Sequence, residues 1–283
     1  KNDNLFTRFC CSLQVGITML NFILKHTIFY MKRFLIFILF FFVFKMNAQQ
    51  NINYLKVSQD LLQQVMNEES YADEVLILSK SSLNDLVLQL NTDTQKKAFW
   101  INIYNAFIQI SLSENPKLYE DKGAFFSEDR IKIAGEVLSF DDIEHGIIRK
   151  SRMKISLGYL RKWFRPKWER KLRVEHIDWR IHFALNCGAK SCPPVAIYSS
   201  EKLDKELDFM AKEYLKEQTT YNAATKTASS VALMSWFRAD FGGKCGARKI
   251  IFDYGITSEK PKNLDFNTYD WTLLLGNYRT IPE

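Results

Sequence analysis

The stretch TQKKAFWINIYNAFIQISL, residues 94–112, decides the fold of this chain. Its apolar side chains cover almost the whole circumference of an α-helix, which predicts a helix that is buried on nearly all sides. Asn102, Asn105 and Gln109 interrupt the apolar pattern at spacings of three and four, so they form one amide stripe. Because a buried amide without hydrogen bonds costs about 1–3 kcal/mol, the stripe either anchors neighbouring loops in a polar network or faces a site.

The segments around this helix predict a single α+β domain, helix-rich in its N-terminal half, with a small antiparallel sheet. Residues 130–140 (RIKIAGEVLSF) alternate around Ala134-Gly135 and predict a β-hairpin. Residues 219–233 predict two short strands. Apolar spacing and capping residues predict further helices over 55–66, 82–90 (capped by Ser81 or Ser82), 143–149 (capped by Asp141) and 199–218, with a helical turn over 234–241.

The pattern of the N-terminal region is typical of a leader. Residues 31–50 (MKRFLIFILFFFVFKMNAQQ) combine Lys32 and Arg33, an apolar run too short to span a bilayer, and a small-residue cleavage site near Ala48. This pattern predicts a signal peptide over 31–48, preceded by an untranslated leader over 1–30; the alternative is a longer signal anchor. We therefore expect an exported protein, periplasmic or secreted, whose single domain covers residues 49–283.

The basic balance of the chain comes largely from this leader. The chain has 39 Lys and Arg against 32 Asp and Glu, and residues 1–48 hold six of the former and one of the latter. The domain is left with a net charge of +2. Overall charge therefore gives no reason to expect a nucleic-acid partner, and membrane contact is expected only through the signal segment.

One segment of the domain is strongly basic. Residues 149–173 hold eleven Lys and Arg against Glu169 alone, with Trp163, Phe164 and Trp168 interleaved. The segment predicts either contact with a polyanion, such as an envelope surface, or a solvated helix face that its tryptophans anchor to the domain.

The stretch HFALNCGAKSCPP, residues 182–194, carries the candidate chemistry. A thiol nucleophile at Cys187 needs a base within hydrogen-bond reach and a group that orients this base. His182 lies five residues away, which places it on a different face of a helix or strand. His145 is therefore the better base, with its neighbour Glu144 or with Asp142 as the orienting group. Backbone amides just after the cysteine could stabilise an oxyanion.

Two other readings of this stretch stay open. His145, His182, Cys187 and Cys192 have the residue types of a tetrahedral zinc site, although no cofactor is the first expectation. Because exported cysteines commonly pair, a disulfide could instead join Cys187 to Cys192, or Cys192 to Cys245. The odd number of cysteines in the domain leaves at least one of them without a partner in the chain.

Four ordered motifs resemble those of the domain of unknown function 547 family. They are FWINIYNAF (99–107), DDIEHGIIR (141–149), RIHFALNCGAKSCPP (180–194) and SWFRADFG (235–242). The resemblance covers residues 80–245 and implies a single domain that is often exported by bacteria, with the first three of these segments meeting around one cleft. It implies no activity. Phe237 and Arg238 stand where the family pattern leads us to expect a tryptophan–tyrosine pair.

Together these features predict a thiol site, in a hydrolase or acyl transferase that acts on an unknown small-molecule or envelope ligand. The alternative is a non-catalytic cell-envelope binding module whose cysteine loop is structural, held by a disulfide or by zinc. The predicted catalytic residues are Cys187, His145, Glu144 and His182. The predicted binding residues are Trp100, Asn102, Tyr104, Asn105, Arg149 and Asn186, and the predicted structural residues are Cys192 and Pro193.

Overall fold

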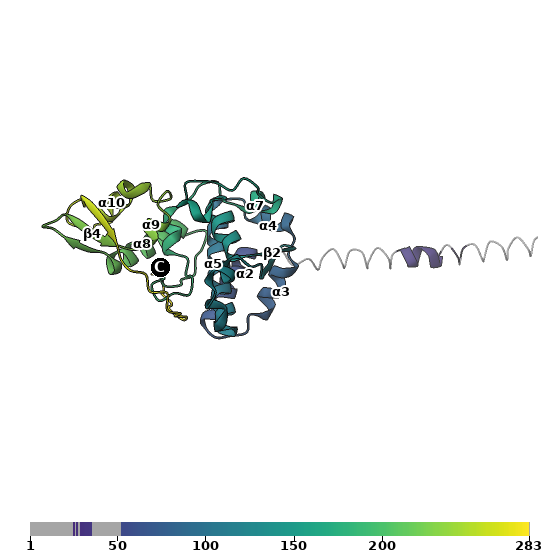
Figure 1. The fold of residues 1–283 in the computed structure, drawn as a ribbon. Helices are drawn as coiled ribbons and strands as arrows, with labels where there is room; N and C mark the ends of the chain where they lie inside the picture. Colours follow the sequence, from purple (N-terminus) through teal and green to yellow (C-terminus); the bar gives the residue numbers. More distant parts are fainter. Residues whose placement is uncertain (1–24, 26, 28, 36–51, 283) are drawn as a thin grey trace, which may run out of the picture. The chain divides into compact units, whose positions relative to one another are not determined.

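The computed structural model describes residues 25, 27, 29–35 and 52–282, and the chain divides into two compact units, Lys1–Ile52 and Asn53–Glu283 (Figure 1). Most of the predicted signal peptide lies outside the described residues. Residues 29–35 are helical. Within the described ranges, no helix is both long enough and apolar enough to cross a membrane.

Helix α5 (Asp93–Glu114) is the centre of the second unit. A capping box begins it: Thr92 Oγ1 accepts a hydrogen bond from the Gln95 amide, and the Gln95 side chain accepts one from the Thr92 amide. Every residue from 96 to 110 is buried, so the prediction of a helix enclosed on nearly all sides is confirmed.

Shorter helices and a hairpin enclose α5 in the N-terminal half. Helix α2 packs along α5, and α3 packs against the first strand of the hairpin (Figure 1). The predictions for 55–66, 82–90 and the hairpin are confirmed, whereas α3 was not predicted. These elements are α2 (Tyr54–Met66), α3 (Ala72–Lys80), α4 (Leu83–Gln89), η1 (Pro116–Tyr119), α6 (Lys122–Ser127), β1 (Ile131–Ile133) and β2 (Glu136–Leu138).

The C-terminal half contains a second hydrophobic cluster, around Phe183, Tyr214, Phe241 and Ile251. Helix α8 begins later than predicted, at Leu203, and buries its apolar face, which includes Leu207, Met210 and Leu215. Strand β4 pairs antiparallel with β3 and parallel with β5, so the expectation of an antiparallel sheet needs correction at β5, which returns to the sheet after α10. The elements are α8 (Leu203–Gln218), β3 (Thr220–Asn222), β4 (Thr227–Ser230), α9 (Leu233–Trp236), α10 (Gly243–Asp253) and β5 (Asn263–Phe266).

Between the two halves, the segment η2 (Asp142–Ile148) is a π-helix where an α-helix over 143–149 was predicted. Its wide turn is closed by a 2.9 Å hydrogen bond from the Arg149 amide to the Glu144 carbonyl, five residues back. Asp141 makes no capping hydrogen bond at its start. A π-helical turn rotates the side chains that follow it and is frequent at functional sites.

The amide stripe of α5 anchors three distant segments. Asn102 accepts from the Tyr198 amide and donates to the Tyr198 carbonyl, both at 2.9 Å. Asn105 accepts from the Asn186 amide and donates to the Ala184 carbonyl, also at 2.9 Å. Gln109 accepts from the Gly276 amide at 3.0 Å. The stripe is therefore the core polar network that was one of its two sequence interpretations.

We expect Asn105→Ala to lower the free energy of unfolding by about 2–5 kcal/mol, because it leaves the Asn186 amide and the Ala184 carbonyl buried without partners. Urea denaturation measures this change. Asn84→Ala, at an exposed position of α4, is the matched control and should change stability by less than about 0.5 kcal/mol. Equal effects of the two variants would contradict the anchoring role of Asn105.

Candidate functional site

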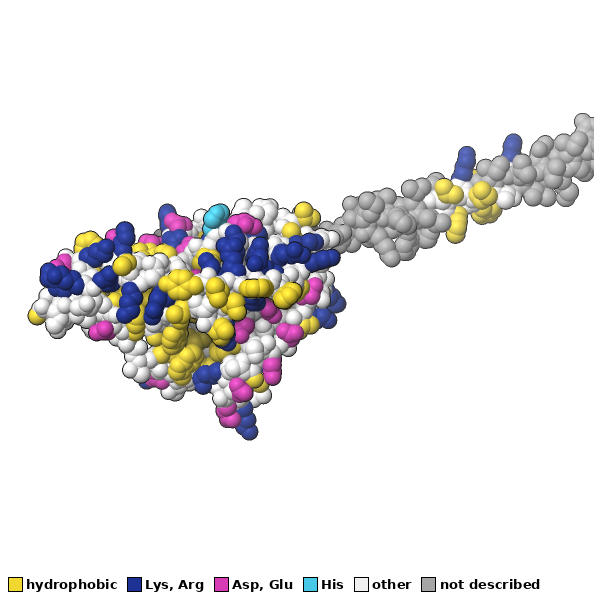
Figure 2. Space-filling model, turned by 45° about the horizontal axis from the view of Figure 1, so that its top comes forward, with side chains coloured by type: hydrophobic (Ala, Val, Ile, Leu, Met, Phe, Trp, Pro, Cys, Tyr) yellow, Lys and Arg dark blue, Asp and Glu magenta, His cyan; other side chains and the backbone are white. Residues whose placement is uncertain are grey.

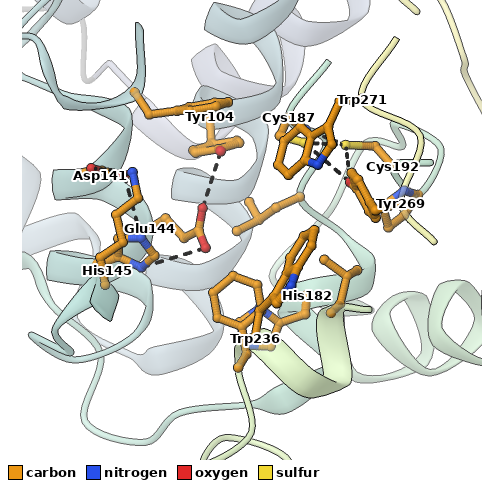
Figure 3. Close-up of a pocket in the computed structure, with 16 residues that line it drawn as sticks. Tyr104, Asp141, Glu144, His145, His182, Cys187, Cys192, Trp236, Tyr269 and Trp271 are labelled. Carbon is orange, nitrogen blue, oxygen red and sulfur yellow. Dashed lines mark hydrogen bonds and ion pairs between the residues drawn. The ribbon is translucent and has the colours of Figure 1, made fainter. Parts of the chain in front are cut away.

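A cavity of about 250 Å³ lies where α5, η2, the cysteine loop (residues 184–195) and the C-terminal segment meet (Figure 3). Its wall is rich in aromatic side chains, with polar and reactive groups on two sides. The lining residues are Tyr104, Phe126, Asp141, Glu144, His145, Lys154, His182, Leu185, Cys187, Cys192, Pro193, Leu233, Trp236, Phe237, Tyr269 and Trp271.

The cysteine loop is held by its own side chains and by the core. The Asn186 side chain donates to the Pro193 carbonyl and accepts from the Gly188 amide, both at 2.8 Å. Gly188 has a φ of +86°, and an added Cβ would lie 2.8 Å from Leu112 Cδ1. Only glycine fits this turn without strain. Asn186 and Pro193 therefore fix the shape of the loop.

The C-terminal segment pairs with the other side of this loop. The Leu274 amide donates to the Gly188 carbonyl, and the Lys190 amide donates to the Thr272 carbonyl, both at 2.8 Å. These bonds bring Tyr269 and Trp271 over the cysteines. The Gly188 amide, which was expected to be free for an oxyanion, is already used by Asn186.

The two cysteines of the loop are free thiols in sulfur–sulfur contact. The Sγ atoms of Cys187 and Cys192 lie 2.6 Å apart, and the Tyr269 hydroxyl lies 3.1 Å from Cys192 Sγ and 3.5 Å from Cys187 Sγ. Hydrogen bonds from Cys192 and Tyr269 lower the pKa of the Cys187 thiol against the opposing effect of burial. Burial and the bond to Cys187 raise the pKa of Cys192 well above its ordinary value. The pair therefore ionises at Cys187 first.

A carboxyl group faces the cavity from η2. Glu144 Oε2 accepts a 3.3 Å hydrogen bond from the Tyr104 hydroxyl, and its side chain is 15% exposed (Figure 3). Burial raises the pKa of Glu144 to about 7, even though the charges of Arg149 and Lys154 lower it. Near neutral pH this group can both give and take a proton.

His145 is oriented by groups behind the cavity wall. Arg149 Nη1 lies 2.8 Å from His145 Nδ1, and because a guanidinium only donates, Nδ1 must accept. The ring proton is thereby assigned to Nε2, which lies 3.5 Å from Asp141 Oδ1. Burial and the charge of Arg149 lower the pKa of His145 well below its ordinary value. His145 is therefore neutral, with no lone pair left for a thiol proton.

Behind both histidines lies a buried ion pair. Asp240 Oδ2 accepts from Arg149 Nε at 2.6 Å and from His182 Nε2 at 2.9 Å, and all three side chains are at most 1% exposed. Burial lowers the pKa of His182 to about 4. Burial acts to raise the pKa of Asp240, but the bonds from His182 and Arg149 lower it overall. This pair fixes the orientation of the two rings.

Two neighbours complete the surroundings of this ion pair. The Phe237 ring stacks on His182 at 3.9 Å between centroids, and Arg149 Cζ lies 4.5 Å from the same ring. Phe237 therefore packs well at the position where it departs from the family pattern. Gly158, at φ +84°, covers the pair from outside: an added Cβ would lie 2.7 Å from Arg149 Nη2 and 2.8 Å from Asp240 Oδ1.

The structure brings all four predicted catalytic residues to one cavity but does not place the histidines next to the cysteine. The Cys187–Cys192 pair and the Glu144–His145 pair lie on opposite sides (Figure 3). The hydrogen bond from Cys187 to His145 that a thiol–imidazole pair needs is not formed, because Arg149 occupies the ring nitrogen. The catalytic roles stay predictions.

The other predicted residues lie around the cavity in different ways. Tyr104 lines it, whereas Trp100, Asn102 and Asn105 are fully buried and face the core. Arg149 acts from behind the wall. Within the described part of the chain, no group of three or more His, Cys, Asp or Glu side chains is arranged to hold a metal, so the zinc set is not assembled. Cys245 is exposed, and its thiol is free.

Several residues of the site were not predicted. Asp240 lies within the motif SWFRADFG, and its acidic type beside a motif arginine was a usable signal. Tyr269 and Trp271 belong to a segment without periodicity, and only their tertiary pairing with the cysteine loop brings them to the thiols.

A family model described as "Protein of unknown function, DUF547" matches residues 87–215. The match contains three of the four motifs and confirms the resemblance, while the SWFRADFG motif lies beyond it. None of the curated proteins matches the chain, and none of the solved structures does. Export of the protein stays a prediction.

We expect Glu144→Gln to remove a pH dependence of stability. The pKa of Glu144 is about 7 in the folded protein, which lies above its value in the unfolded chain. At pH values between these two pKa values, the folded state therefore binds more protons than the unfolded state. Wild-type stability therefore falls as pH rises from about 4 to 8, by about 3 kcal/mol from this group. The difference in free energy of unfolding, variant minus wild type, should rise by that amount over this range. Urea titrations at each pH measure it.

Glu120→Gln is the control, because Glu120 is exposed on the surface. Its difference from wild type should stay flat with pH. Parallel curves for wild type and Glu144→Gln would show that Glu144 ionises in its ordinary range.

Proposed function

We propose that this chain, a member of the DUF547 family over residues 87–215, is a thiol-dependent acyl-transfer enzyme, a hydrolase or acyl transferase, with Cys187 as its nucleophile. One observation supports this most: a half-buried cysteine with a lowered thiol pKa stands across a small cavity from a carboxyl group whose pKa is about 7. A nucleophile and a proton carrier on facing walls are what acyl transfer needs.

Glu144 takes the proton-carrying role that the sequence suggested for His145. The Cys187 thiolate attacks the carbonyl carbon of an ester, thioester or amide, and protonated Glu144 gives its proton to the leaving group. The resulting thioester on Cys187 is then attacked by water, which loses a proton to the Glu144 carboxylate, or by an acceptor alcohol or amine. The acid product leaves, and the thiolate is restored with Glu144 protonated.

The other groups act on these two. His145 and His182 are positioning residues, since burial keeps both rings neutral while Arg149 and Asp240 hold their orientation. The Tyr104 hydroxyl orients the Glu144 carboxyl group. The Tyr269 hydroxyl and the Cys192 thiol stabilise the Cys187 thiolate, because each donates to it.

The cavity indicates the class of acyl group. Trp236, Trp271 and Tyr269 pack against one another on one wall, with centroid distances of 4.7–5.5 Å, and the two tryptophan rings are stacked. With about 250 Å³ of space, the site suits a small apolar or aromatic acyl group. The natural substrate would carry such a group on an envelope or small-molecule component.

Incubation with 4-nitrophenyl acetate should acylate Cys187, an adduct that intact-protein mass spectrometry and peptide mapping detect. Cys187→Ser should lose the adduct, because a serine hydroxyl in this setting is not ionised. Cys245→Ser, which removes the exposed thiol, is the matched control and should keep it. Glu144→Gln should slow the later hydrolysis of the acetyl group from Cys187 by about 100-fold or more, the usual size of a general-base contribution, because the 4-nitrophenolate itself leaves without a proton. Acylation of Cys245 without Cys187 would overturn the proposal.

The sulfur–sulfur distance of 2.6 Å favours a second candidate, the non-catalytic envelope binding module with a disulfide-pinned loop. In that case the two thiols would undergo exchange with a disulfide of another protein. Cys187 and Cys192 would become joined by a disulfide, and the two cysteines of the other protein would be released as thiols. The aromatic cavity would then bind a ligand without reacting with it.

Alkylation with and without prior reduction separates the two candidates. For the enzyme we expect iodoacetamide to modify Cys187 in unreduced protein, faster than Cys245, because the thiolate is the reactive form. Modification of Cys187 and Cys192 only after reduction would favour the binding module. Mass spectrometry of tryptic peptides gives the result.

A further inference from the structure

The basic segment forms a hairpin on the surface of the domain. The Lys162 amide donates to the Ser151 carbonyl at 2.8 Å, and the Met153 amide donates to the Leu160 carbonyl at 2.9 Å. A hydrogen bond of 3.0 Å from the Ala239 amide to the Leu157 carbonyl ties the tip to the body. The predicted solvated helix face is limited to α7 (Lys167–Leu172), which follows the hairpin.

Large apolar side chains on this hairpin and on the bend after it are in solvent. Ile155, Trp163 and Phe164 are 87%, 88% and 92% exposed, and Tyr159 and Leu160 are more than half exposed. The expectation that the tryptophans anchor the segment holds for Trp168, which packs against the core, but not for Trp163. Grouped exposure of this kind marks an interaction surface.

Uncompensated positive charge surrounds these side chains. Arg149, Lys150, Lys154 and Lys162 form ion pairs with carboxylates. The other cations of the segment have no ion pair within the described part of the chain: Arg152, Arg161, Arg165, Lys167, Arg170, Lys171 and Arg173. On the face shown in Figure 2, Lys and Arg side chains gather along a band of hydrophobic ones.

We propose that the docking surface, residues 151–171, binds an anionic lipid bilayer. Trp163, Phe164 and Ile155 enter the boundary between headgroups and acyl chains, where aromatic side chains are favoured. Arg161, Lys167, Arg170 and Lys171 bind the headgroup phosphates. This assignment adds a membrane contact to the one expected from the signal segment, and it is independent of any chemistry at Cys187.

The apolar residues decide between a bilayer and other polyanions. A nucleic acid or a polysaccharide would use the cations and could stack on Trp163, but it offers nothing to aliphatic Ile155 and Leu160. A bilayer takes both kinds of side chain at once. Lys154 belongs to both the hairpin and the cavity wall, so the docking surface borders the cavity.

Tryptophan quenching by brominated phosphatidylcholine tests the proposal in the full chain. Residues 1–52 contain no tryptophan, so quenching reports only the domain. We expect quenching in vesicles that also contain phosphatidylglycerol, and little in vesicles of phosphatidylcholine alone. Trp163→Phe should remove most of the quenching while it preserves binding in a sedimentation assay, because phenylalanine keeps the apolar contact.

A pair of charge variants tests the cations. Arg170→Glu with Lys171→Glu should weaken vesicle binding by about tenfold or more, since each cation near an anionic surface contributes several-fold. Lys205→Glu with Lys212→Glu, on the exposed face of α8, makes the same change in net charge and should weaken binding much less. All these positions are exposed, so we expect the variants to unfold at the same temperature as the wild type. This measurement verifies that the variants are folded.

Three results would overturn the proposal. Quenching that is unchanged in Trp163→Phe would show that this side chain does not enter the bilayer. If the two double charge variants lost vesicle binding equally, net charge alone would account for the effect. Sedimentation velocity without lipid could instead show self-association that Trp163→Ser with Phe164→Ser abolishes, which would assign the surface to a second copy of the chain.

Discussion

The fold depends on one constraint, that a helix buried on all sides cannot leave its amide side chains without hydrogen bonds. Asn102 and Asn105 meet this constraint with both the oxygen and the nitrogen of their amides, and Gln109 meets it with its oxygen, by bonding to the backbone of segments that have no regular structure of their own. Each amide thereby supplies hydrogen bonds that a neighbouring strand would supply to the backbone in a sheet. The cysteine loop is the most important of these segments, because Asn105 holds it at the residue before Cys187.

A second constraint acts on the other side of the cavity. A guanidinium and a carboxylate that are buried together need hydrogen-bond partners, and Arg149 and Asp240 bond to each other and to two histidine rings. The bond from Arg149 fixes the tautomer of His145, and burial keeps both rings neutral. The ion pair is thus a rigid back wall, and the titrating group that it leaves facing the cavity is Glu144.

The sequence was most informative where a pattern is local. The period of residues 94–112 predicted the central helix, and Ala134-Gly135 predicted the hairpin turn. Cys187, His145, Glu144 and His182 were chosen by residue type and reach the same cavity. The sequence could not predict the π-helical turn, and this turn determines the side chains of η2 that face inward. Nor could it predict the parallel strand β5. It also could not predict Tyr269, because the pairing of the C-terminal segment with the cysteine loop is tertiary.

Gly158 has a thermodynamic consequence. Its backbone lies directly on Arg149 and Asp240, so the hairpin tip and the ion pair cannot change conformation separately. Any partner that shifts the hairpin must therefore change the affinity of the cavity for its ligand, and the ligand must change the affinity for that partner by the same factor. A partner on the hairpin and a ligand in the cavity would thus be linked in this reciprocal sense through a glycine that binds neither of them.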